Sequence, residues 1–166
     1  LHGGAYGDGG HPHRDPLLER VNAHSSVPGE AWDRNRPLDE KPINMLSGDK
    51  FHEKYLFDDK VASASAYQYD GTKGGTAWKM KVRGYFISKV PALVGILKWA
   101  ENHDQDTVKA ETFDAVVGHF MDRPRQDLLN TQIWGFLGAC LPPGTALTLY
   151  NRAEDLNGLD AWRTIV

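Results

Sequence analysis

The chain has 166 residues, of which 40% are hydrophobic, a length that supports one hydrophobic core and a tail rather than two full domains. Its formal net charge of −3 gives no positive field that would draw the whole chain to a nucleic acid, so any such contact has to be local. The single cysteine, Cys140, excludes an intrachain disulfide and a zinc site built from several thiolates, and no apolar run approaches the roughly 20 residues that span a bilayer.

The first forty residues contain few large aliphatic side chains and combine turn-forming residues with charges. We expect residues 1–36 to form a flexible or extended N-terminal arm. Residues 37–66 follow as a linker, in which SGDKFHEKYLFDD predicts a short helix and VASASAYQY a weakly alternating stretch. The helical domain then covers residues 67–166. Because the chain begins without methionine, we expect it to be a piece or a processed product of a larger protein.

The first three helices of the domain follow a glycine-rich segment. Thr76 is placed to cap the first of them. Its apolar face, at helical spacing, consists of Trp78, Val82, Tyr85 and Phe86. Pro91 suits the first turn of the second helix. Asp106 or Thr107 is placed to cap the third, and Pro124 is expected to stop it.

Three further helical segments complete the chain. One is expected over about residues 126–141. Its apolar side consists of Leu129, Ile133, Phe136, Leu137 and Cys140. A short helix follows over residues 144–153, and the last begins at Asn157, with Asp160 three residues on as in a capping box. These segments show no convincing strand pattern, so the predicted fold class is all-α: a bundle of five or six short helices preceded by an extended N-terminal arm.

The segment DGTKGGT, residues 70–76, resembles the opening of a deviant ATPase phosphate loop. The continuation does not fit, because Ala77 and Trp78 stand where a glycine and a lysine are needed and Lys79 replaces the magnesium-binding hydroxyl. We interpret the segment as a turn into a helix and keep a nucleotide-binding enzyme that uses residues 71–76 as an alternative. No other cluster predicts a catalytic residue, metal ligand or cofactor, so we expect the protein not to be an enzyme.

Cations surround the first helix of the domain and could contact RNA phosphates. The candidates are Lys73, Lys79, Lys81 and Arg83. An ordinary solvated helix face explains them as well, because acidic residues balance the total charge, and a small helical nucleic-acid-binding module stays an alternative. Trp99 and Trp134 fall off the apolar stripes of their helices. We expect these two, with Trp32 of the arm, to be exposed at a self-association surface, since aromatic residues are favoured in interface cores.

The segment YDGTKGGTAWKMKVRGYFISK resembles the start of the Gag capsid-like region of copia-type (Ty/copia, LTR) retrotransposons. In that family an apolar or aromatic residue and Gly-Thr or Gly-Ser lead to a tryptophan, a basic residue and an amphipathic helix. The matching residues are Tyr69, Gly71, Thr72, Trp78, Lys79, Val82, Tyr85 and Phe86. The end of the chain is similar to the family's final helix through Ala161, Trp162 and Ile165. The resemblance covers about residues 67–166.

This resemblance implies a structural protein that self-assembles into a capsid-like shell around retroelement RNA, in cytoplasmic virus-like particles. It implies a homo-oligomer, with RNA as a further partner, no membrane and no cofactor. The chain would be the front part of a larger Gag. It departs from the family in its longer glycine-rich loop and in lacking the zinc knuckle, so RNA packaging by a knuckle is not expected of it. We hypothesise that residues 1–36 lie across a neighbouring copy in the lattice.

Overall fold

The structure is a computed structural model that describes residues 33–39, 56–103 and 106–166. It divides into two compact units, Leu1–Asp33 and Arg34–Val166, of which the second contains nearly all of the described residues. Within the described ranges every regular element is helical, which confirms the all-α fold class. The expected helix around Phe51 and Tyr55, and the arm as far as Trp32, lie outside these ranges.

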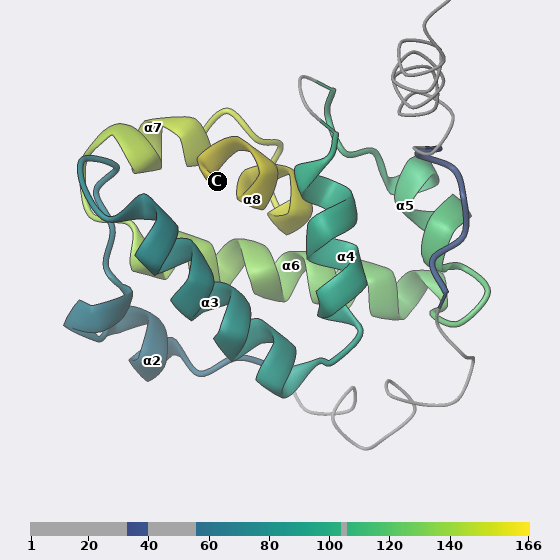
Figure 1. The fold of residues 1–166 in the computed structure, drawn as a ribbon, viewed down its shortest axis with the longest axis horizontal. Coiled ribbons are helices and arrows are strands. Elements are labelled where there is room, and N and C mark those ends of the chain that lie inside the picture. Colours follow the sequence, from purple (N-terminus) through teal and green to yellow (C-terminus); the bar gives the residue numbers. More distant parts are fainter. Residues whose placement is uncertain (1–32, 40–55, 104–105) are drawn as a thin grey trace, which may run out of the picture. The chain divides into compact units, whose positions relative to one another are not determined.

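The described elements are seven α-helices and one 3-10 helix (Figure 1). In chain order they are α2 (Asp59–Ser63), η2 (Ser65–Tyr67), α3 (Gly75–Lys89), α4 (Leu93–Glu101), α5 (Ala110–Val117), α6 (Arg123–Cys140), α7 (Thr145–Tyr150) and α8 (Gly158–Ile165). The last helix, α8, packs against α4, α6 and α7. The longest, α6, also contacts α2 and α5, and α3 lies against α4 and η2. The centre of the bundle is therefore completed by the last part of the chain.

Apolar side chains at helical spacing form the core. Every residue predicted for the apolar side of α6 is buried, and Trp78, Val82 and Phe86 of α3 are buried as predicted. In α8, Leu159 and Trp162 are fully buried. Each large apolar side chain removed from water contributes roughly 1.5–3 kcal/mol, so these three helices supply much of the driving force for folding.

Two of the predicted helix starts and one predicted helix end are wrong. The N-cap of α3 is Gly74, in the left-handed conformation with a φ of 77°, so Thr76 lies inside the first turn and does not cap. The N-cap of α5 is Lys109, beyond both residues expected to cap it. Pro124 does not stop α5, because it occupies the first turn of α6. A proline is tolerated there, since the N–H groups of the first turn make no hydrogen bond within the helix. Asp122 is the N-cap of α6, and its side chain accepts a hydrogen bond from Arg125 N.

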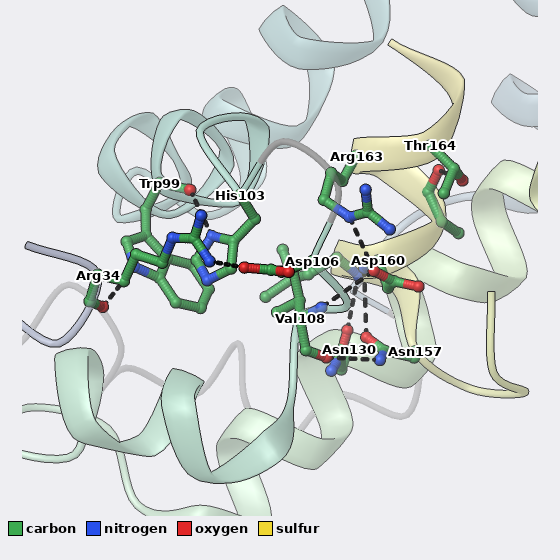
Figure 2. Close-up of polar contacts among 12 residues, drawn as sticks. Arg34, Trp99, His103, Asp106, Val108, Asn130, Asn157, Asp160, Arg163 and Thr164 are labelled. Carbon is green, nitrogen blue, oxygen red and sulfur yellow. Dashed lines mark hydrogen bonds and ion pairs between the residues drawn. The ribbon is translucent and has the colours of Figure 1, made fainter. Parts of the chain in front are cut away.

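The predicted cap of α8 is confirmed. Asn157 Oδ1 accepts a hydrogen bond from Asp160 N at 3.2 Å. The side chain of Asp160 does not return to the cap, however. It is buried and accepts hydrogen bonds from Val108 N at 3.0 Å and from Arg163 Nε at 2.9 Å (Figure 2). Asn157 Nδ2 donates to Val108 O at 2.8 Å, so both backbone polar groups of Val108 are bonded to the start of α8.

The segment VASASAYQY forms part of α2 and the 3-10 helix η2, so the expected alternating stretch is wrong. Asp58 caps α2 by accepting a hydrogen bond from Lys60 N, and the helix buries Ala62. The linker also contributes Leu56 and Phe57 to the core. A short apolar segment with a good N-cap is therefore helical here, although its residues alternate in polarity.

The end of the expected arm is bonded to the domain that follows it. Trp99 Nε1 donates to Arg34 O at 3.0 Å, and Leu38 N donates to Val116 O at 2.9 Å. Residues 33–39 accordingly run beside α5 (Figure 1). The hypothesis that residues 1–36 lie across a neighbouring copy stays a prediction.

Candidate self-association surface

The glycine-rich loop at residues 70–76 is a turn into α3. Asp70 O accepts a hydrogen bond from Ala146 N at 3.0 Å, and a Cβ atom at Gly71 would lie 2.6 Å from that nitrogen. Asp70 Oδ1 accepts from Thr72 N at 2.9 Å and from its hydroxyl at 2.7 Å, and these hydrogen bonds lower the pKa of the carboxyl. The carboxylate of Asp70 thus accepts the hydrogen bond of Thr72 N, a backbone N–H group of the kind that a phosphate loop donates to its ligand.

Two of the predicted RNA-contacting cations face α4. Lys79 Nζ donates to Glu101 Oε2 at 2.9 Å, and Arg83 Nη2 donates to Val94 O at 3.5 Å. Both side chains are partly buried. These two cations are therefore engaged within the domain and support the contact between α3 and α4.

The other two cations point elsewhere. Lys81 Nζ lies 5.7 Å from the ring centroid of Tyr67 in η2, on the opposite side of α3 from Lys79. Lys73 is exposed in the loop before the helix. The four cations are thus not gathered on one face, and RNA contact by them stays a prediction that their placement does not favour.

Trp99 is only 2% exposed, so the expectation that it is exposed at a contact surface is wrong. Its ring stacks on Phe113 of α5 at 5.7 Å between centroids and packs edge-on against His103 at 4.3 Å. Arg34 and α5 therefore cover the side of α4 that carries Trp99, which the apolar spacing of this helix did not predict to be buried. Val94, on the same helix, is 48% exposed.

Trp134 is half-buried on α6 and lines a hollow of about 240 Å³. The other lining residues are Phe57, Asp59, Thr131, Gln132, Gly135, Phe136 and Leu156. Phe57 and Phe136 are core residues, with ring centroids 5.9 Å apart, and they lie on the apolar part of a hollow whose lining also includes polar side chains. A Cβ atom at Gly135 would meet no atom within 4 Å, so the hollow is open at this point.

Leu156 borders the same hollow and is 53% exposed. Its φ of 66° makes it the only non-glycine residue with a positive φ in the described part of the chain. The residues after it fix this geometry: Asn157 caps α8, and a Cβ atom at Gly158 would lie 2.4 Å from Asn130 O of α6. Sequence reasoning missed Leu156, although a lone leucine in the polar turn EDLNG was a usable signal.

We define the 134/156 surface as Trp134, Gly135 and Leu156 with the hollow that they border. Its two halves come from different elements, because Trp134 and Gly135 lie on α6 and Leu156 lies in the turn before α8. Tyr150 OH donates to Trp134 O at 2.9 Å, and the two rings lie 5.3 Å apart, which holds α7 against this part of α6. The surface is therefore built on fixed elements.

Other chemistry is sparse in the described ranges. They contain no group of three or more His, Cys, Asp or Glu residues that could hold a metal ion, and none of their helices is long and apolar enough to cross a membrane. Burial raises the pKa of the Cys140 thiol to about 12, so it stays protonated and poorly nucleophilic at neutral pH.

No family model matches the chain, and neither a curated protein nor a solved structure matches it. The resemblance of residues 67–166 to a copia-type Gag region therefore depends on the chain's own residues.

Proposed function

We propose that the chain is a structural, non-enzymatic Gag-type protein that self-associates as part of a capsid-like shell around retroelement RNA. The observation that carries the proposal is the 134/156 surface, on which an exposed leucine lies beside a partly apolar hollow. The resemblance of residues 67–166 supports the type of protein. In this proposal the protein acts in cytoplasmic virus-like particles and needs no cofactor.

A second copy of the chain fits this surface because one patch presents both a projection and a cavity. In a two-fold contact each copy offers the same patch, so Leu156 of each copy enters the hollow of the other. Burying the two leucines would contribute roughly 1.5–3 kcal/mol each. The half-buried Trp134 beside the hollow would then lie in the centre of the interface, where tryptophan is enriched.

A shell needs more than this one contact, because a closed two-fold interface by itself produces only a dimer. Met80 of α3 is 62% exposed and Val94 of α4 is 48% exposed. Arg83 of α3 reaches the carbonyl of Val94, so these two helices present apolar positions on adjoining faces. They are the candidates for a second contact that extends a dimer into an assembly.

The proposal is tested by placing a charge in the hollow. The change Gly135→Glu puts a carboxylate at an open position, where a Cβ atom meets nothing within 4 Å. Replacing a glycine inside a helix also favours the helix by roughly 0.5–1 kcal/mol, so folding is retained. The matched control is Gly84→Glu in α3, which is equally open and exposed. Sedimentation velocity over a wide concentration range, followed by electron microscopy of large species, measures the assembly.

We expect the unchanged chain and Gly84→Glu to form dimers and larger species as concentration rises, and Gly135→Glu to shift the dimerisation midpoint to at least about tenfold higher concentration. A chain that stays monomeric at millimolar concentration would contradict self-association. Equal assembly of both variants would agree with self-association but would show that the 134/156 surface does not take part in it.

A further inference from the structure

A second hollow, of about 580 Å³, lies between residues 34–35, the end of α4 and the start of α5. Its lining residues are Arg34, Asn35, His103, Asp106, Thr107, Lys109 and Thr112. Every one of these side chains is polar, unlike those around the 134/156 surface. Figure 2 shows Arg34, His103 and Asp106 side by side at this position. The size is in the range of small-molecule sites.

The hydrogen bonding of His103 restricts which ligands this hollow can bind. The side chain is 1% exposed, and its Nδ1 lies 3.0 Å from Trp99 O. A carbonyl oxygen can only accept, so Nδ1 carries the hydrogen and, in the neutral ring, Nε2 carries a lone pair. Nε2 is buried and has no hydrogen-bond partner among the described residues. A buried acceptor without a donor is costly, so this atom favours a ligand that brings one.

Burial, more than the surrounding charges, lowers the pKa of His103 and favours the neutral ring. Burial is the largest effect that lowers its pKa, and the positive charges of Arg34 and Arg163 act in the same direction. The hydrogen bond to Trp99 O and the negative charge of Asp160 oppose them without reversing the shift. At neutral pH Nε2 is thus an acceptor.

The rest of the hollow favours an anion. Arg34 uses Nη1 to pair with Asp106, which leaves the other N–H groups of its guanidinium. Lys109 is exposed, and no ion pair engages it within the described residues. It is also the N-cap of α5 and makes no side-chain cap, so the first-turn N–H groups of that helix have no acceptor from the N-cap side chain.

We propose that this hollow binds hydrogen phosphate, an anion that still carries a P–O–H group at neutral pH. Its negative oxygens are bound by Lys109, by the free donors of Arg34 and by the hydroxyl of Thr112, and its P–O–H donates to His103 Nε2. Sulfate carries no proton at neutral pH and would place an oxygen lone pair against that of Nε2. The site therefore selects phosphate over sulfate. This inference concerns a ligand and is independent of the proposed self-association.

The experiment uses the full 166-residue chain with inorganic phosphate and sulfate, compared by calorimetry at pH 7.5 and matched ionic strength. We expect phosphate to bind about tenfold more tightly than sulfate, the ratio that one hydrogen bond supplies. As the pH is lowered until His103 takes up a proton, we expect the ratio to shrink, because Nε2 of the protonated ring is a donor. The ring carbons of His103 should shift in NMR spectra on addition of phosphate.

The matched variants are Lys109→Met, which removes a cation of the hollow, and Lys98→Met, which removes an exposed cation of α4 outside it. Only the first should weaken phosphate binding, by several-fold, and neither should affect folding. Adenosine 5′-monophosphate has a second phosphate pKa of about 6 and so carries no P–O–H group at pH 7.5; it should bind more weakly than hydrogen phosphate. Any binding of an RNA oligonucleotide without a terminal phosphate should be the same in Lys109→Met as in the unchanged chain.

Equal affinity for sulfate and phosphate at pH 7.5, or no phosphate binding at millimolar concentration, would overturn the proposal. So would phosphate binding that Lys109→Met leaves unchanged. Binding of the unphosphorylated oligonucleotide that depends on Lys109 would replace the hydrogen phosphate site with an RNA contact. Sedimentation of the same samples reports self-association separately, so failure of either proposal is distinguishable from failure of the other.

Discussion

Leu156 is a large apolar residue that is exposed and held in the left-handed conformation. This conformation costs an L-residue with a bulky side chain roughly 1–2 kcal/mol of stability. Because the side chain of Leu156 is largely exposed, it contributes little hydrophobic stabilisation to the monomer. The close contact between Gly158 and α6 and the cap at Asn157 impose this geometry. Strain of this kind persists where surrounding structure enforces it, often at binding surfaces.

Replacing Leu156 with asparagine should separate stability from association. Asparagine tolerates a positive φ, so Leu156→Asn should raise the free energy of unfolding by about 0.5–1 kcal/mol in urea titrations. The same change should weaken self-association, because the projection is lost. Leu156→Ala is the matched variant, which removes the projection without relieving the backbone and should weaken association with little change in stability. A less stable Leu156→Asn protein that associates normally would contradict both expectations.

Trp134 and Trp99 show how far spacing alone predicts exposure. Both fall off the apolar stripes of their helices, yet Trp134 is half-buried at the surface and Trp99 is buried. The difference arises from residues 34–39, which are distant in sequence and cover Trp99 through its bond to Arg34 O. Spacing gives the phase of a side chain on its own helix but not which remote segment packs over it.

Among the elements, α8 depends most on a buried polar network. Asp160 is 3% exposed and joins Val108, before α5, to Arg163 of α8 (Figure 2). Charge-assisted bonds to a backbone N–H and a guanidinium satisfy the buried carboxylate. The network therefore orients the segment that enters α5 relative to the central helix.

Removal of this carboxylate should destabilise the fold strongly. Asp160→Ala leaves Arg163 Nε and Val108 N without their acceptor in a buried site, and we expect the free energy of unfolding to fall by about 3 kcal/mol. Asp155→Ala, in the exposed turn just before α8, is the matched control and should change stability by less than about 0.5 kcal/mol. Chemical denaturation of the two variants measures the difference, and equal stabilities would show that the network is not structural.

Helix positions were predictable from apolar spacing, but helix starts were less so. The apolar side of α6 and the cap of α8 are as expected, because both are local features of the sequence. Pro124 misled the prediction, since proline both stops a helix and suits the first turn of the next. Lys109 begins α5 without a side-chain cap, after Val108 is bonded to α8, and such a start depends on tertiary contacts.

The whole domain should lose stability as pH falls, through His103. Burial lowers the pKa of His103 from its ordinary value of 6.5, so the unfolded chain takes up a proton before the folded one does. The stability is fully present above about pH 6.5 and is lost as pH falls below it toward the folded pKa. We expect the free energy of unfolding, measured in urea titrations, to be lower at pH 5.5 than at pH 7.5.

The comparison of two histidine variants isolates this effect. His103→Gln should flatten the dependence on pH, whereas His119→Gln, at an exposed position, should keep it. Buffers without phosphate are needed, because phosphate bound at the hollow beside His103 would stabilise the folded state by itself. An unchanged slope in His103→Gln would assign the pH dependence to other groups.

At the scale of the molecule, the sequence predicted an all-α domain and one of the residues of the 134/156 surface. Trp134 was found from its phase on α6. Leu156 and the hollow were not, because they depend on the packing of the turn before α8 against α6 and on the linker residue Phe57. A surface assembled from three distant segments leaves no single pattern in the sequence.

The most direct test of the account is whether Leu156 of one copy meets the hollow of another. Chains carrying Leu156→Cys and chains carrying Gly135→Cys are mixed and oxidised mildly; the native Cys140 is buried and does not compete. A disulfide needs Cα atoms within about 7 Å, so only docked copies can form it. We predict that the mixed dimer exceeds both homodimers and that mixing Leu156→Cys with Gly84→Cys gives no such product. Equal yields in the two mixtures would contradict the account.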